Sequence, residues 1–247
     1  RNRQGYRVQV VDVQDIYDIF SYGVVGADPI HDFLAYAYAN WPEPAPSYVL
    51  LFGNGNYNPK HYGGSPEESL IPPYLAYTDP SMGETAADNR YVTLAGVDRM
   101  PDMMLGRVTV KTLGDATAFV NKVISYENNP DPGDWDKAVM LVADNADEGG
   151  DFPASSNYLA DNLVYDNFTV TRVHLGGGEG EYSNPDEAHA AVVAGFNRGN
   201  VLVNYIGHGA YTQWAGLDNT PYSGLLFEIN DVYNDLTNGS KLPVILA

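Results

Sequence analysis

Short apolar runs alternate with amphipathic helical patterns along this chain, and this alternation restricts its fold more than any other feature. In the second half, strand-like runs occur at residues 138–142, 169–173, 201–205 and 242–246. Helical patterns between them lie near 155–163, after Asn184 and at 225–236. Strands that alternate with helices predict a mostly parallel sheet with helices on both faces, because each helix carries the chain back to begin the next parallel strand.

The first half repeats the alternation less regularly. It predicts strands at 7–13, 48–52, 91–94 and 103–105, and helices after Asp28 and after Thr112, with Asp28 as the cap of the first helix. Residues 53–90, rich in Gly, Pro, Asn and Tyr, form an elaborated surface loop in this interpretation. We therefore expect an α/β protein of two side-by-side Rossmann-like or caspase-like lobes.

A run of turn-forming residues, Asn128-Asn129-Pro130-Asp131-Pro132-Gly133-Asp134, separates the two halves. It predicts an N-terminal α/β subdomain over residues 1–130 and a second subdomain over residues 131–247.

The composition of the chain restricts the classes of partner that it can bind. The chain has 247 residues, 44% of them hydrophobic, which is enough for a large core. A net charge of −19 repels polyanions, so nucleic acid is not expected as a partner. No run reaches the roughly 20 apolar residues of a membrane-spanning helix, and with zero cysteines the chain has no thiol of its own.

Both ends of the chain predict a longer polypeptide. Arg1 leads almost directly into a predicted strand, and the apolar run from Leu242 to Ala247 closes without a turn residue or polar cap. A buried strand seldom ends a protein in this way.

One histidine stands where a parallel sheet places functional groups. His208 follows the apolar run 201–205 and lies between Gly207 and Gly209. Glycines here let a substrate carbonyl approach a peptide N–H, as an oxyanion hole requires. The alternative from these residues alone is a histidine that only hydrogen-bonds within a tight turn. We interpret His31, His61, His174 and His189, which lack this context, as surface or capping residues.

The segments around His208 resemble peptidase family C25, the gingipain-type cysteine peptidases of the caspase-like clan. The resemblance rests on Leu202-Val-Asn-Tyr-Ile-Gly-His-Gly209, on the following Trp214, and on Leu236-Thr-Asn-Gly-Ser-Lys-Leu-Pro-Val-Ile-Leu246. Earlier blocks match in the same order, including Tyr48-Val-Leu-Leu-Phe-Gly53, Leu105-Gly-Arg107 and Asp144-Asn-Ala-Asp-Glu-Gly-Gly150. The resemblance implies that 131–247 is a caspase-like catalytic subdomain truncated before its nucleophile, and that 1–130 lacks its first strand.

The family mechanism that this implies is attack of a cysteine thiolate on a peptide bond. His208 would ionise the thiol and then protonate the leaving amine, and the Gly209 N–H would help to hold the oxyanion. The cysteine would lie a few residues beyond Ala247. Glu148 is the closest match to the acid that orients the histidine, with Asp147 or Asp144 as alternatives, because the spacing differs from that of the gingipains.

Substrate and cofactor expectations also follow from the resemblance. Asp151 is the nearest candidate to receive an Arg or Lys side chain before the cleaved bond, and Trp214 would line the cleft. No cofactor is required, but two acidic groups could hold a structural Ca²⁺. They are Asp131, Asp134 and Asp136, and Asp144, Asp147, Glu148 and Asp151.

Two functions therefore stand side by side. The first is a secreted or cell-surface cysteine endopeptidase that acts on proteins or peptides. The second is a non-catalytic or transpeptidase-like C25 module within a large cell-surface protein.

Overall fold

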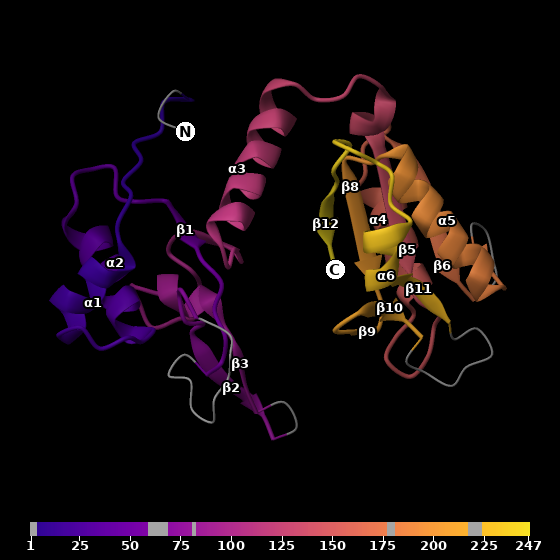
Figure 1. Ribbon diagram of the computed structural model, residues 1–247. Coiled ribbons are helices and arrows are strands. Elements are labelled where there is room, and N and C mark those ends of the chain that lie inside the picture. Colours follow the sequence, from indigo (N-terminus) through magenta and orange to yellow (C-terminus); the bar gives the residue numbers. More distant parts are fainter. Residues whose placement is uncertain (1–3, 59–68, 81–82, 177–180, 217–223) are drawn as a thin grey trace. The chain divides into compact units, whose positions relative to one another are not determined.

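The computed structural model describes residues 4–58, 69–80, 83–176, 181–216 and 224–247 (Figure 1). The chain forms two compact units, Arg1–Phe119 and Val120–Ala247. This division passes through helix α3 (Leu113–Asn128), upstream of the turn-rich segment. The subdomain limits 1–130 and 131–247 remain a proposal.

The second unit contains a five-stranded parallel sheet, as the alternating pattern predicts. Its strand order is β12-β8-β5-β6-β7. The strands are β5 (Ala138–Ala143), β6 (Thr169–Leu175), β7 (Glu181–Tyr182), β8 (Leu202–Ile206) and β12 (Val244–Leu246). The mixed α/β class with mostly parallel sheets flanked by helices is confirmed.

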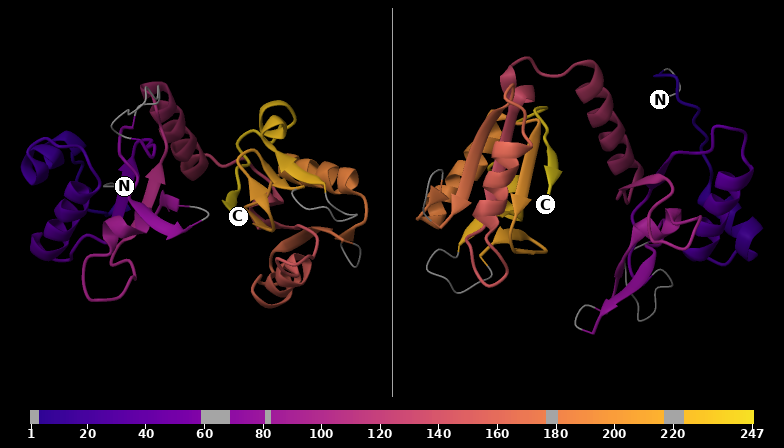
Figure 2. Two further views of the ribbon diagram at one scale, coloured as in Figure 1. Left: turned by 90° about the horizontal axis from the view of Figure 1, so that it is seen from below. Right: turned by 180° about the vertical axis from the view of Figure 1, so that it is seen from behind.

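Helices cover both faces of this sheet, and the central strand β5 shows why. Met140 and Val142 pack into a core cluster that includes residues of α5 (Pro185–Arg198). Val139 and Leu141 point to the other face, where Ala160 of α4 (Phe152–Asn162) packs. A strand buried on both sides reads as a continuous apolar run rather than an alternating one. Figure 2 shows α4 and α5 on opposite sides of the sheet.

The predicted helix at 225–236 is wrong in its first part. Residues Leu225–Glu228 form strand β11, and helix α6 covers only Ile229–Asn234. β11 pairs with β10 (Gln213–Ala215), which pairs with β9 (Gly209–Ala210). Pairing buries Leu226 and Phe227 in the α5-side core, so tertiary packing decides this segment.

The first unit has a smaller sheet. β1 (Tyr48–Phe52) and β4 (Met104–Val108) are parallel, and β2 (Leu75–Asp79) and β3 (Gly83–Ala86) form an antiparallel pair within the expected loop 53–90. The core gathers side chains from α1 (Val13–Ser21) and α2 (Asp28–Asn40) beside β1.

Three predictions for this unit are wrong. Residues 7–12 form no strand; instead Asp12 caps α1 by accepting a hydrogen bond from the Gln14 N–H. The predicted strand at 91–94 is replaced by a 3-10 helix, η2 (Asp88–Val92), which buries Tyr91 completely. Asp28 lies inside α2 rather than capping it. Burial of Tyr91 and Val92 accounts for η2, whereas residues 7–12 are exposed and have no such packing.

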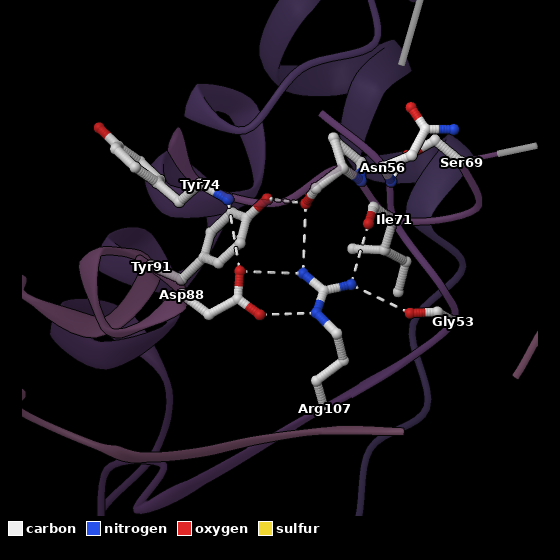
Figure 3. A network of polar contacts seen from close by, with 9 residues as sticks. Gly53, Asn56, Ser69, Ile71, Tyr74, Asp88, Tyr91 and Arg107 are labelled. Atoms are coloured by element: carbon white, nitrogen blue, oxygen red, sulfur yellow. Dashed lines mark hydrogen bonds and ion pairs between the residues drawn. The ribbon is translucent and has the colours of Figure 1, made fainter. Parts of the chain in front are cut away.

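Arg107 of β4 connects the irregular segments of this unit (Figure 3). Its guanidinium pairs with both carboxylate oxygens of Asp88, at 2.6 and 3.1 Å. It also donates to the backbone carbonyls of Gly53, Ile71 and Pro72 at 2.9 to 3.2 Å. Five donors thus meet five acceptors, and β4 is tied to η2 and to the segment after β1.

Candidate functional site

Two neighbouring parallel strands, β5 and β8, end side by side, and each is followed at once by a polar side chain. Asp144 comes directly after β5, and His208 comes two residues after β8. The Asp144 N–H donates to the Ile206 carbonyl at 3.0 Å, which ties the two strand ends together. The pair lies at the carboxyl edge of the sheet, where open α/β folds place their sites.

The Asp144 carboxylate contacts His208 twice. Its Oδ2 atom lies 3.1 Å from Nδ1 of the ring and accepts the His208 backbone N–H at 3.2 Å. The Asp144 side chain is 2% exposed, whereas that of His208 is 37% exposed. Burial raises the pKa of the Asp144 carboxyl, against the hydrogen bonds from Asn145 and His208, which lower it. A partly exposed imidazole thus rests on a buried acid, an arrangement that fixes its tautomer and orientation.

A tight turn at residues 147–150 lies beside the imidazole. The Asp147 and Gly150 backbones exchange hydrogen bonds of 3.1 and 3.2 Å, and the Asp147 Oδ2 lies 3.5 Å from His208 Nδ1. A Cβ atom added at Gly149 would stand 3.2 Å from His208 Nε2. The turn therefore gives the ring a second carboxylate, and its glycine leaves room beside the outer ring nitrogen.

The start of α4 completes the surroundings of the ring. Phe152 meets His208 edge to face, with 5.2 Å between centroids and 87° between planes. This contact limits rotation of the imidazole.

The predicted site residues lie as follows. Glu148 is an exposed residue of the 147–150 turn, and the carboxylates in contact with His208 are Asp144 and Asp147, the two alternatives. Gly209 is exposed and immediately follows His208 at the start of β9. The catalytic roles of His208, Gly209 and the acid are taken up below as proposals.

Asp151 has a structural task of its own. It is the N-cap of α4, and its Oδ1 accepts the Ala154 N–H at 3.0 Å. It also borders an open hollow of about 520 Å³ whose other walls include Tyr158 and Ile206. The carboxylate is exposed toward solvent and within the same unit as His208.

Trp214 is half-buried and stacks on Tyr205, with 4.6 Å between ring centroids and 1° between planes. It also packs near Phe227 and Phe196, at 5.3 and 6.3 Å. The contact with substrate expected for Trp214 stays a prediction.

Sequence reasoning missed Tyr205. Its hydroxyl donates to the His208 carbonyl at 2.5 Å, although the chain places it three residues earlier. The sequence did offer a signal, because Tyr205 lies in the Asn-Tyr-Ile-Gly-His run that leads to His208. In a strand its side chain points to the face opposite to that of Asn204.

One of the other histidines was interpreted wrongly. His174 is completely buried, and its Nε2 lies 3.0 Å from the Ser156 hydroxyl. Burial lowers its pKa to about 4. His31 and His189 are partly exposed, and His61 lies outside the described residues.

Among the residues that the structure describes, no three His, Asp or Glu side chains gather in a way that could hold a metal ion. None of the helices in those ranges combines the length and the apolar character needed to cross a membrane.

Comparisons with known proteins identify the family of this chain. The model of peptidase family C25 matches residues 1–247. Gingipain R2 and gingipain R1 of Porphyromonas gingivalis are each 24% identical over 252 residues, which include 99% of this chain. The chain spans 28% of that gingipain R2 and 21% of that gingipain R1.

Solved structures show the same fold. The complex of the Porphyromonas gingivalis RgpB pro- and mature domains matches with a TM-score of 0.70 at 25% identity, over 99% of this chain and 49% of that one. The crystal structure of the Arg-specific cysteine proteinase gingipain R matches with a TM-score of 0.63 at 24% identity, over 95% of this chain and 50% of that one. With its whole length matched by the family model, this chain belongs to the cysteine peptidase family C25.

Proposed function

We propose that this chain supplies the histidine and its supporting acid to a cysteine endopeptidase whose nucleophile lies beyond Ala247. The observation that carries the proposal is the pairing of His208 Nδ1 with the buried Asp144 at the carboxyl ends of β8 and β5. The chain itself contains no cysteine, so thiolate chemistry requires a residue outside it.

The chemistry follows from the ring's orientation. With its proton on Nδ1 directed at Asp144, His208 presents Nε2 as the base that takes the thiol proton. The thiolate attacks the peptide carbonyl, and the Gly209 N–H helps to hold the resulting oxyanion. His208 then gives its proton to the departing amine, and water releases the acyl group from sulfur.

Strand β12 is the element that we propose leads to the nucleophile. It is the parallel neighbour of β8, with Leu246 paired to Asn204, so its continuation runs toward the edge where His208 lies. The test is the sequence immediately after Ala247 in the encoding gene. A cysteine within about five residues is expected, since each strand residue advances about 3.3 Å. Its absence would remove the peptidase proposal and favour the non-catalytic module.

We assign the orienting acid to Asp144 rather than to Glu148 or Asp147. Of the two carboxylates in contact with the ring, Asp144 is the closer to Nδ1, at 3.1 against 3.5 Å, and the more buried. In the complete polypeptide, Asp144→Asn should lower kcat/KM by about 100-fold. Glu148→Gln is the matched control and should stay within about threefold of the wild type. The reverse order of effects would transfer the role to Glu148.

Cleavage after Arg or Lys is proposed through Asp151, whose carboxylate borders the hollow beside α4. Asp151→Asn separates its two tasks, because asparagine caps a helix as well as aspartate but carries no charge. We expect kcat/KM for an Arg peptide to fall about tenfold relative to the matching Ala peptide, with unchanged thermal stability. An unchanged Arg-to-Ala ratio would exclude Asp151 as the specificity residue.

Peptide hydrolysis and transpeptidation share the first half of this chemistry. Mass analysis of the products with and without an added amine acceptor separates them, since only a transpeptidase joins the acyl group to the amine. We expect hydrolysis products under both conditions, and an amine adduct as the main product would favour the transpeptidase-like alternative.

Protein or peptide substrates, a secreted or cell-surface location and a structural Ca²⁺ belong to the same proposal. Calcium is tested most directly, because an ion that binds only the folded state raises the melting temperature. We expect CaCl₂ to raise it above the value in MgCl₂ of equal ionic strength, and EGTA to abolish the rise. Equal values in both salts would remove calcium from the proposal.

A further inference from the structure

The backbone carbonyl of His208 is held by two donors that do not belong to the proposed catalytic group. The Tyr205 hydroxyl donates to it at 2.5 Å, and the Ala215 N–H donates to it at 2.8 Å. The Tyr205 side chain is buried, and burial raises the pKa of its phenol well above the ordinary value, with the Asp144 carboxylate adding to the rise. The hydroxyl therefore remains a proton donor across the working range of a peptidase.

Tyr205 is itself immobilised. Its ring lies flat against Trp214, and Trp214 packs near Phe196 of α5 and Phe227 of β11. These aromatic rings belong to the core on the α5 side of the sheet. This packing fixes the position of the Tyr205 hydroxyl. Its hydrogen bond therefore restrains the turn that carries His208.

The second donor, Ala215, has an unusual backbone conformation. Ala215 has a φ of 59°, in the left-handed region, and is completely buried next to a register shift between β10 and β11. Gln213 donates its side-chain amide to the Ala215 carbonyl at 2.9 Å. Left-handed conformations of residues other than glycine persist only where the surroundings enforce them, and they gather at functional sites. The Ala215 N–H that donates to the His208 carbonyl therefore belongs to a residue whose surroundings enforce its conformation.

Space for these contacts depends on Gly207. A Cβ atom at this position would lie 2.3 Å from the Asp144 Cβ and 2.5 Å from the Tyr205 hydroxyl. The turn that carries His208 thus packs between Asp144 and Tyr205. Asp144 holds the His208 N–H and ring, and Tyr205 holds its carbonyl.

We infer that Tyr205 is a positioning residue for His208, holding the His208 carbonyl so that the imidazole keeps its proton-transfer geometry. This role rests on the proposed function of His208 as the base. It also predicts that the hydroxyl contributes to turnover more than to substrate binding, because a displaced base slows proton transfer without removing a substrate contact.

The chain offers a matched control in its other unit. Tyr91 is also buried, and its hydroxyl donates to the Pro72 carbonyl at 2.5 Å. Tyr205→Phe and Tyr91→Phe therefore remove the same kind of bond, and both keep the ring. In the complete polypeptide, we expect Tyr205→Phe to lower kcat about tenfold with KM within about twofold, and to move the histidine limb of the pH–rate profile. Tyr91→Phe should leave kcat and the profile unchanged.

The controls separate the two proposals. If His208→Ala is as active as the wild type, the proposed function of His208 fails. If His208→Ala is inactive while Tyr205→Phe and Tyr91→Phe behave alike, only the positioning role is overturned.

A measurement on the wild-type chain covers the case in which Tyr205→Phe does not fold. We expect NMR to show a slowly exchanging hydroxyl proton for Tyr205 and rapid exchange for Tyr22, which is 98% exposed. Equally fast exchange at both hydroxyls would show that the bond to His208 is not maintained, and it would overturn the inference.

Discussion

His208 is held at three points, its amide, its carbonyl and one ring nitrogen, by Asp144, Tyr205 and Ala215. The ring nitrogen in contact with Asp144 is Nδ1, and the other ring nitrogen, Nε2, lies next to Gly149. At the scale of single residues the site is thus a restrained imidazole with one face kept open by glycine. For the base that we propose, such restraint lowers the entropic cost of each proton transfer.

A methyl group at position 149 tests this arrangement. In Gly149→Ala the Cβ would stand 3.0 Å from the Asp147 Oδ1 and 3.2 Å from His208 Nε2, so the ring or the turn must shift. We expect kcat/KM of the complete polypeptide to fall about tenfold, with stability changed by less than about 1 kcal/mol. Gly114→Ala, where the nearest contact is an ordinary 3.5 Å, is the control and should retain full activity. Full activity of Gly149→Ala would contradict the proposed use of Nε2.

His174 predicts a pH dependence of folding. Burial lowers its pKa from 6.5 to about 4. Between pH 6.5 and pH 4, His174 is therefore protonated in the unfolded chain but neutral in the folded chain. The free energy of unfolding should therefore fall by about 3 kcal/mol as the pH falls from 6.5 to 4.

Urea denaturation at several pH values measures this term. His174→Gln should be less stable at pH 7, because it disturbs a buried hydrogen bond, but should show a shallower decline below pH 6.5. His31→Gln, at a partly exposed position, should keep the wild-type slope. Equal slopes in all three proteins would assign the acid sensitivity to other groups.

At the scale of elements, single residues at the helix ends determine where several helices begin and end. Asn184 caps α5 by accepting a 2.9 Å hydrogen bond from the Asp186 N–H, and Asp151 caps α4. Helix α1 ends differently, with Tyr22 at its C-terminus in the left-handed conformation, φ 55° and 98% exposed. Glycine is the residue that favours this conformation.

Tyr22→Gly should therefore stabilise the chain by about 0.5–1 kcal/mol, since it relieves the backbone cost without removing a buried side chain. Tyr22→Ala loses the same ring but keeps a Cβ atom, so it should show no gain. Thermal unfolding of both variants beside the wild type measures the difference. Equal stability of the two variants would mean that the left-handed backbone costs little here.

At the scale of the whole molecule, the net negative charge lowers the stability of the folded state. The chain carries a net charge of −19, and the mutual repulsion of its carboxylates is greatest in the folded state. Added salt screens this repulsion, most completely between exposed charges that lie farther apart than the Debye length, about 10 Å at about 0.1 M salt.

We expect the free energy of unfolding to rise by about 1 kcal/mol between about 0.05 M and about 0.5 M NaCl. Urea denaturation at each salt concentration measures it, and glycerol at matched osmolality controls for general solute effects. A constant or falling stability with salt would show that attractive ion pairs, such as Arg107 with Asp88, outweigh the net repulsion.

The sequence by itself determined the parallel architecture and the position of His208 at a strand end. These features are encoded locally, in apolar periodicity and in residues within a few positions of each other. The tertiary structure alone decided that Asp144 and Asp147 are the acids at the imidazole, that β11 is a strand, and that His174 is buried. The reason is physical: Asp144 and His208 are 64 residues apart, and they meet only because β5 and β8 are neighbours in the sheet.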